Sequence, residues 1–205
     1  MNRSSRMLAV SLAMLALAPM THAATITTSA NLAGANENPA TTSPATGTTF
    51  VTLDTTTHRL RVNVVFNGLT ANATGAHIHC CTSPPGNVGV ATTLPAFAGF
   101  PLGVTGGSLD QTYDTTLAST WNPAYVTNSG GTTAGAEAAL AAGLAAGQAY
   151  LNLHTSTFPT GEIRGFLAQS SPAIGAIPTL SDWALGGLGV LLAAATWLML
   201  RRRAG

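Results

Sequence analysis

The central part of the chain alternates apolar and polar residues over short stretches that are separated by turn-forming residues. Two such stretches, 49–54 and 60–69, are joined by the sequence Thr-Thr-Thr-His, and Arg61 and Asn63 stand between apolar residues in the second. Because successive side chains of a strand point to opposite faces, this alternation predicts a sheet with one buried face and one wet face.

Further strands are expected at 75–81, at 88–94, and in a hairpin whose strands span 148–155 and 162–168. Residues 25–45 are expected to add an edge strand, and 95–131 to form a long loop with one or two edge strands. The Ala/Leu run at 133–147 is the only helical pattern. Short antiparallel strands with one short helix in a connection predict a mainly β fold, an Ig-like or Greek-key β-sandwich.

The first 23 residues have the organisation of a secretory signal peptide. Arg3 and Arg6 precede an uncharged run at 7–18, and small residues at 21 and 23 suit cleavage after Ala23. A permanent N-terminal anchor is the alternative, but the run is shorter than the roughly 20 residues that span a bilayer. Export by signal peptidase is therefore expected.

The other end of the chain has the pattern of a membrane-spanning tail. Residues 183–200 carry no charge and are followed by Arg201, Arg202 and Arg203. Such a stretch can cross a bilayer with the arginines on the cytoplasmic side, whereas a buried core helix would not need that terminal cluster. The predicted organisation is a signal peptide (1–23), a β domain (24–169), a linker (170–176) and a tail (177–205).

The tail also carries a specific motif. Ile177, Pro178, Thr179, Leu180 and Trp183, followed by the apolar stretch and the arginine cluster, resemble the IPTL-type C-terminal sorting domain, a relative of the signals handled by exosortases in Gram-negative bacteria. The resemblance implies an exosortase-type transpeptidase as partner. It also implies anchoring on the periplasmic side of the inner membrane, followed by transfer to the cell surface or extracellular matrix.

Composition narrows the range of partners. Between residues 24 and 177 there are three arginines, no lysine and six carboxylates, which give a formal net charge of −3. No basic stripe exists for nucleic acid, so nucleic-acid binding is not expected. The 31 threonines favour strands, and 46% hydrophobic residues argue against disorder.

Three motifs of the body occur in a recognisable order: Gly-Ala-His-Ile-His (75–79), Tyr-Leu-Asn-Leu-His-Thr (150–155) and Gly-Glu-Ile-Arg-Gly-Phe-Leu (161–167). Together they resemble the CHRD domain over residues 30–168. The resemblance implies an extracellular β-rich module without an assigned chemical activity. We therefore expect a cell-surface or matrix interaction module whose partner is an extracellular protein or a polysaccharide.

The histidines suggest an alternative function. On a strand, His77 and His79 share a face at a separation of roughly 6–7 Å, and His154 lies on the polar face of a later strand. If those strands are neighbours, three imidazoles could bind Cu or Zn with an open fourth position. The order His77, His79, His154, Arg164 faintly resembles copper–zinc superoxide dismutase, which adds a possible dismutase-like activity, although no bridging histidine or zinc loop is present.

Simpler interpretations remain open. The histidines could be scaffold residues that hydrogen-bond loop backbone, and Glu162 with Arg164 could form a surface ion pair. Cys80 and Cys81 could form a vicinal disulfide, which the oxidising compartment favours. Alternatively, Cys80 is a small core residue, or Cys81 is a fourth metal ligand.

Known enzyme templates do not fit the chain. It has no Gly-rich phosphate loop after a strand, no Gly-x-Ser-x-Gly elbow and no His-Glu-x-x-His motif. No catalytic residue is assigned, and the sequence favours a non-enzymatic role.

Overall fold

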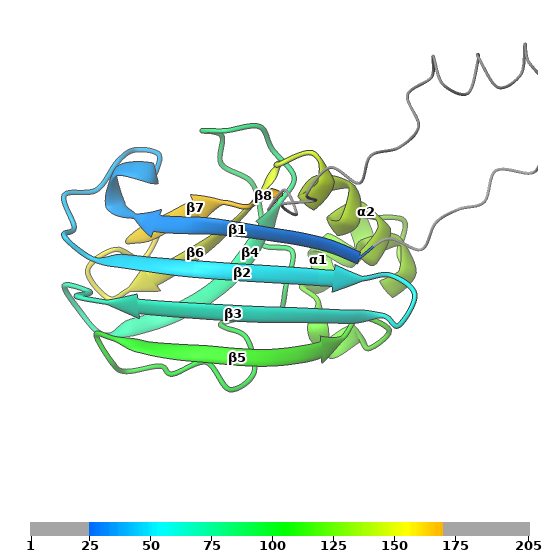
Figure 1. Cartoon of the computed structure of the whole chain (residues 1–205), viewed down its shortest axis with the longest axis horizontal. Helices are drawn as coiled ribbons and strands as arrows, with labels where there is room; N and C mark the ends of the chain where they lie inside the picture. The colour runs from blue at the N-terminus through cyan, green and yellow to red at the C-terminus, as the bar shows by residue number, and fades with distance from the viewer. Residues whose placement is uncertain (1–24, 170–205) are drawn as a thin grey trace, which may run out of the picture. The chain divides into compact units, whose positions relative to one another are not determined.

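The computed structural model of the protein describes residues 25–169, and Figure 1 shows them as strands that wrap around a core with helices at one end. The strands are β1 (Thr25–Ala33), β2 (Thr46–Asp54), β3 (Arg59–Asn67), β4 (Ala73–Cys80), β5 (Gly107–Asp114), β6 (Ala149–Thr155), β7 (Ile163–Phe166) and β8 (Ala168–Gln169). The connections contain two 3-10 helices, η1 (Gly34–Asn36) and η2 (Ala118–Thr120), and two α-helices, α1 (Pro123–Asn128) and α2 (Thr133–Ala145). This part of the chain is mainly β, as the sequence predicts.

The strands form one antiparallel sheet in the order β4-β6-β7-β1-β2-β3-β5, with β8 paired to β1. The sheet curls so that β4, β6 and β7 lie behind β1, β2, β3 and β5 in Figure 1. The two layers of the expected sandwich are thus continuous, because β1 pairs with β7 at Ala33 and Arg164. The expectation that β1 is an edge strand is wrong: it pairs along its whole length with β2 and also with β7 and β8.

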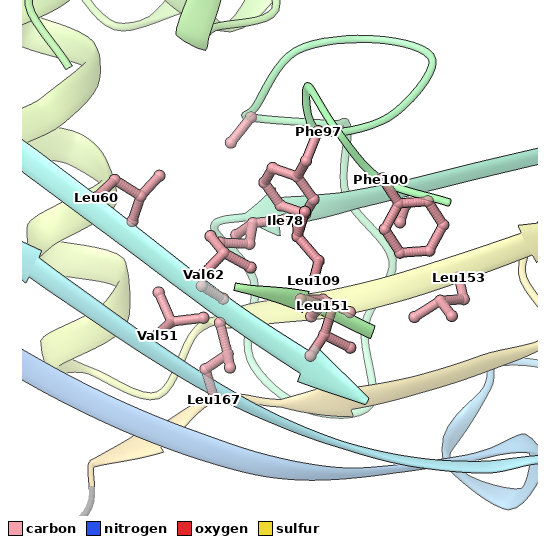
Figure 2. Close-up of a cluster of buried hydrophobic side chains, with 14 of the residues drawn as sticks. Val51, Leu60, Val62, Ile78, Phe97, Phe100, Leu109, Leu151, Leu153 and Leu167 are labelled. Atoms are coloured by element: carbon pink, nitrogen blue, oxygen red, sulfur yellow. The ribbon is translucent and has the colours of Figure 1, made fainter. Parts of the chain in front are cut away.

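The core lies between the two layers (Figure 2). The inward residues of β2 and β3 meet those of β4 and β6, and two phenylalanines of the β4–β5 connection, Phe97 and Phe100, complete the cluster. Val51, Val62, Ile78 and Leu151 are fully buried. These residues alternate with polar ones along each strand. The alternation in the sequence therefore predicts correctly which side chains point into the core.

Two connections differ from the sequence expectation. Residues 88–94 form no strand and pair only through isolated bridges, such as the one between His79 and Val90. The 95–131 segment contains the expected edge strand, β5, but also the short helix α1, so the prediction of a single helix is wrong. Helix α1 begins at Pro123, where the side chain of Asn122 accepts a hydrogen bond from the Ala124 amide.

Several expectations concern residues outside the described range. These are the signal peptide (1–23), the linker (170–176), the sorting motif, the membrane helix (183–200) and the arginine tail. Within residues 25–169, no helix has the length and apolar character needed to cross a membrane. The signal peptide, the linker and the membrane helix therefore stay predictions.

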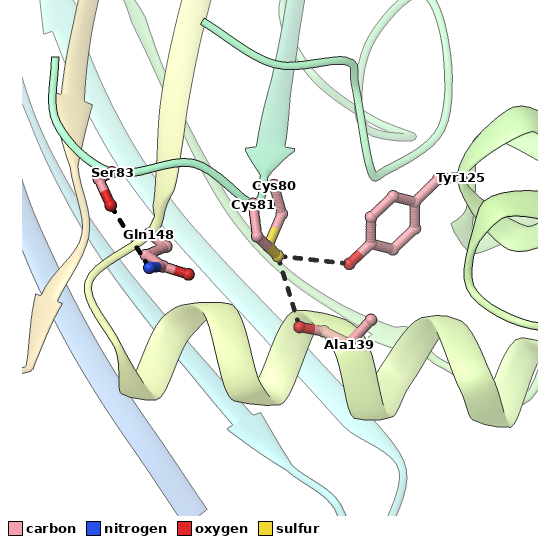
Figure 3. Close-up of a disulfide and its surroundings, with 6 residues drawn as sticks. All are labelled: Cys80, Cys81, Ser83, Tyr125, Ala139 and Gln148. Atoms are coloured by element: carbon pink, nitrogen blue, oxygen red, sulfur yellow. Dashed lines mark hydrogen bonds between the residues drawn. A yellow bond between two sulfur atoms is a disulfide. The ribbon is translucent and has the colours of Figure 1, made fainter. Parts of the chain in front are cut away.

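Cys80 and Cys81 form a disulfide at the end of β4. The disulfide lies against α2 (Figure 3). The sulfur of Cys81 is 3.5 Å from the carbonyl oxygen of Ala139 and 3.9 Å from the hydroxyl of Tyr125. With both sulfurs bonded to each other and packed on the helix, Cys81 is not available as a metal ligand.

The packing of the disulfide on α2 predicts a strict requirement for glycine at position 143. A Cβ at Gly143 would overlap the sulfur of Cys80 and come within 2.5 Å of that of Cys81. Gly143→Ala should lower the free energy of unfolding by about 1–3 kcal/mol through overpacking. This loss is expected even though alanine is intrinsically favoured over glycine in a helix by about 1 kcal/mol. Urea denaturation followed by circular dichroism measures the difference.

A matched control is Gly89→Ala, because a Cβ at Gly89 would meet no heavy atom within 4 Å. This variant should unfold at the same urea concentration as the parent. Equal stability of Gly143→Ala and the parent would contradict the described packing of helix and disulfide.

Candidate functional site

Three histidines converge on the outer face of the rear layer. Strands β4 and β6 are neighbours, and their register places His77 opposite Asn152 and His154 opposite Gly75. The ring centroid of His77 is 4.7 Å from that of His154 and 5.5 Å from that of His79. One ring nitrogen from each histidine lies within 4.8 Å of the others. The sequence does not show whether the strands that carry the histidines are neighbours. The structure shows that β4 and β6 are.

Each imidazole uses one nitrogen to bind backbone and leaves the other without a partner. Nδ1 of His79 donates to the carbonyl of Val88 at 2.7 Å, and Nδ1 of His154 donates to that of Pro159 at 3.0 Å. His77 hydrogen-bonds the backbone of Pro95. Because a carbonyl oxygen only accepts, the bonded nitrogen carries the proton and the other nitrogen keeps its lone pair.

The remaining nitrogens are Nδ1 of His77, Nε2 of His79 and Nε2 of His154, and all three are buried without a hydrogen-bond partner. Burial lowers the pKa of His77 to about 3, with a further contribution from the neighbouring histidines. Burial also lowers the pKa of His79 to about 4 and lowers the pKa of His154. The three rings are therefore neutral at physiological pH, which is the state that ligates a metal.

The alternation predicts that the histidines lie on a wet surface. They do not, because loops cover this face of the sheet. His77 and His79 are only 6% and 7% exposed. Gly75 lets the covering loop approach, because a Cβ there would come within 2.7 Å of the Pro95 carbonyl oxygen and 3.2 Å of His77 Nε2. A covering loop that joins distant residues leaves no periodic signal in the sequence.

Arg164 ties the covering loops to β7. Its guanidinium donates to the carbonyls of Asn36 at 2.6 Å and Pro85 at 2.8 Å, and to Oδ1 of Asn87 at 2.6 Å. It also lies 4.8 Å from the centroid of the Tyr150 ring. Arg164 is 1% exposed, so it is a buried residue whose hydrogen bonds hold the loops in place.

The expected surface ion pair between Glu162 and Arg164 is wrong. Glu162 is fully buried, and its carboxylate accepts hydrogen bonds from the Ser43 hydroxyl, the Thr70 amide and the Thr155 hydroxyl. Although burial raises the pKa of Glu162, these hydrogen bonds lower it below its usual value. Glu162 precedes β7, which begins at Ile163, and its partners are Ser43, Thr70 and Thr155 rather than Arg164.

Glu37 and Tyr150 belong to the same face; alternation along β6 already places Tyr150 on the face of His154, whereas Glu37 was not predicted from the sequence. The Tyr150 ring stacks on that of His79, with centroids 4.6 Å apart and planes 7° from parallel. Glu37 follows η1 and lies 3.8 Å from Arg164, measured from Oε2 to Nε. A carboxylate in an irregular segment carries no pattern that would assign it to this face.

The three free nitrogens have the chemistry of a metal site. Bonds of about 2.0–2.1 Å at tetrahedral angles would place ligand nitrogens roughly 3.4 Å apart, so the rings would close slightly around an ion. The hydrogen bonds from the opposite nitrogens to backbone fix each ring's tautomer, as the outer partners of metal-binding histidines do. Three imidazoles suit Cu or Zn and leave a fourth position for water or another ligand.

Comparison with known protein families gives two matches. The model of the CHRD domain matches residues 28–167, and that of the IPTL-CTERM motif matches residues 176–203. Comparisons with curated proteins and with solved structures found no match.

Proposed function

Because the chain belongs to the CHRD domain family and ends in an IPTL-CTERM motif, we propose that it is an exported, C-terminally sorted protein whose domain binds one Cu or Zn ion. The ligands are His77, His79 and His154. Two observations support this proposal: one ring nitrogen from each histidine lies within 4.8 Å of the others, and each ring has one buried nitrogen without a hydrogen-bond partner.

The energetics favour a bound ion. A buried polar atom without a partner costs about 1–3 kcal/mol, and each ring of the histidine cluster has one such atom. If the histidines were only scaffold residues, they would need only the nitrogens that bind the backbone. This interpretation leaves the three remaining nitrogens unexplained. One metal ion would satisfy all three at once.

Metal stoichiometry tests the proposal. The full chain, purified without chelator in a non-ionic detergent and dialysed against buffer that contains Cu(II) or Zn(II), should retain about one equivalent of metal by mass spectrometry. Treatment with a strong chelator should remove the ion and lower the melting temperature, because metal binds the folded state preferentially. Metal at less than about a tenth of an equivalent after dialysis would contradict the proposal.

The proposal does not include dismutase chemistry. Dismutation needs a redox-active ion, and three imidazoles suit redox-inert Zn as well as Cu. No described residue is assigned a catalytic role.

The same chain is proposed to act at the cell surface or in the matrix. Signal peptidase would remove residues 1–23, and the tail would hold the protein at the periplasmic side of the inner membrane until an exosortase-type transpeptidase cuts near Ile177. The sorting motif at 176–203 supports this route. Mass spectrometry of the cell-surface form should find no peptide from 184–205, and an intact tail in that form would contradict the cleavage.

An interaction role for the domain is a second proposal. Phe50 and Val65 are 55% and 49% exposed on the outer face of the front layer, opposite the core. Exposed apolar side chains among the threonines of this face suit contact with an extracellular protein or a polysaccharide.

A further inference from the structure

A cavity of about 550 Å³ adjoins the histidine cluster. Its wall is formed by His79 on β4, by Tyr150 and Asn152 on β6, by the segment from Glu37 to Thr42, by Asn87 and Val88, and by the turn of the β6–β7 hairpin. A volume of this size can hold a small organic molecule. Its size and lining make the cavity a candidate binding site, next to the proposed metal position.

Two buried acceptor atoms in the cavity wall have no hydrogen-bond partner. They are Oε1 of Glu37 and Oδ1 of Asn152, and their residues are 9% and 2% exposed. An ideal Cβ on Gly161 would be 2.8 Å from each of these oxygens and 2.5 Å from Nδ2 of Asn152, so all three atoms border the same space beside Gly161. The Asn152 side chain also hydrogen-bonds Glu37, but Oε1 of Glu37 and Oδ1 of Asn152 still lack a donor, which a ligand with N–H groups would supply.

The charge of Glu37 is only partly compensated. Its nearest cation is Arg164, but Nε of Arg164 is 3.8 Å from Oε2 and donates to the Asn36 carbonyl instead. Burial raises the pKa of Glu37 to about 7, against the opposing effects of Arg164 and Asn152. The carboxylate thus lacks a close, hydrogen-bonded positive partner.

We propose that this cavity binds a small primary ammonium ligand, whose N–H groups donate to Glu37 and Asn152. An ammonium group has three donors and no acceptor, which matches two unpartnered oxygens of which one belongs to a carboxylate. The ring of Tyr150 and the side chains of Phe158 and Pro39 line the same cavity and would contact the carbon part of the ligand. An anion is disfavoured, because both free atoms are acceptors.

The test uses metal-free protein, so its outcome is independent of the histidine site. The ¹⁵N-labelled full chain in a non-ionic detergent is treated with chelator at about pH 8, where Glu37 is mostly ionised. It is then titrated with ethanolamine or with its neutral analogue ethylene glycol. The Gly161 amide and the Asn152 side-chain amide should shift with ethanolamine, and ethanolamine should bind at least about tenfold more tightly than ethylene glycol.

Two variants complete the experiment. Glu37→Gln keeps the shape of the side chain and removes its charge, and it should weaken ethanolamine binding by about tenfold or more. Asp110→Asn removes an exposed carboxylate of β5 that pairs with Arg61, and it should leave binding unchanged. Thermal melts establish that both variants are folded. Equal binding of the two probes, or unchanged ethanolamine binding in folded Glu37→Gln, would overturn the proposal and indicate that water fills the cavity.

Discussion

Replacing His79 with alanine should lower the affinity of the protein for Cu(II) or Zn(II) by at least about 100-fold. Mutation of an outer partner of a metal ligand already costs 10–100-fold, and the loss of a ligand itself costs more. Nε2 of His79 is one of only three unpartnered nitrogens in the cluster, so two imidazoles would remain, which are too few for a tight site. Competition against a chromophoric chelator measures the affinity.

His58→Ala is the matched control. The side chain of His58 is 48% exposed and pairs with Glu137, away from the cluster. This variant should bind metal as the parent does. Equal metal affinity of the His79→Ala and His58→Ala variants would show that the ion binds elsewhere.

Replacing Arg164 with methionine should lower the free energy of unfolding by about 3–5 kcal/mol, because it removes one partner of a buried charged network. The change would leave the carbonyls of Asn36 and Pro85 without their donor and Glu37 without its nearest cation. Methionine has a similar length, so most of the packing volume is kept. Urea denaturation gives the free energy of unfolding.

Arg61→Met provides the comparison. Arg61 makes a close pair with Asp110, at 2.6 Å, but the two side chains are 59% and 44% exposed. Exposed pairs contribute little to stability, so this variant should be nearly as stable as the parent. A larger loss from Arg61→Met than from Arg164→Met would contradict the role assigned to Arg164.

Alternation in the sequence is sufficient to assign the faces of the site strands. His77 and His79 in β4 and His154 in β6 all lie on the face opposite the core residues Ile78 and Leu151, as predicted. Their convergence depends on which strands pair, and β4 and β6 are about 70 residues apart in the chain. A single sequence contains no periodic signal for a pairing between such distant strands.

The residues that complete the site could not be predicted for a related reason. Glu37 and the covering loops reach the histidines through contacts between irregular segments, and Arg164 finds its partners in backbone carbonyls rather than in a nearby carboxylate. Side-chain contacts with distant loop backbone depend on the complete fold. The same limit explains why β1 was expected at an edge, since its neighbours β7 and β8 come from the end of the domain.

The coordination of a bound ion tests the central claim most directly. X-ray absorption and anomalous diffraction of the Cu- or Zn-loaded protein should show three imidazole nitrogens at about 2.0–2.1 Å from one ion. These should be Nδ1 of His77, Nε2 of His79 and Nε2 of His154, the nitrogens that have no hydrogen-bond partner. An ion held by other residues, or a loaded protein in which these nitrogens remain unligated, would contradict the claim.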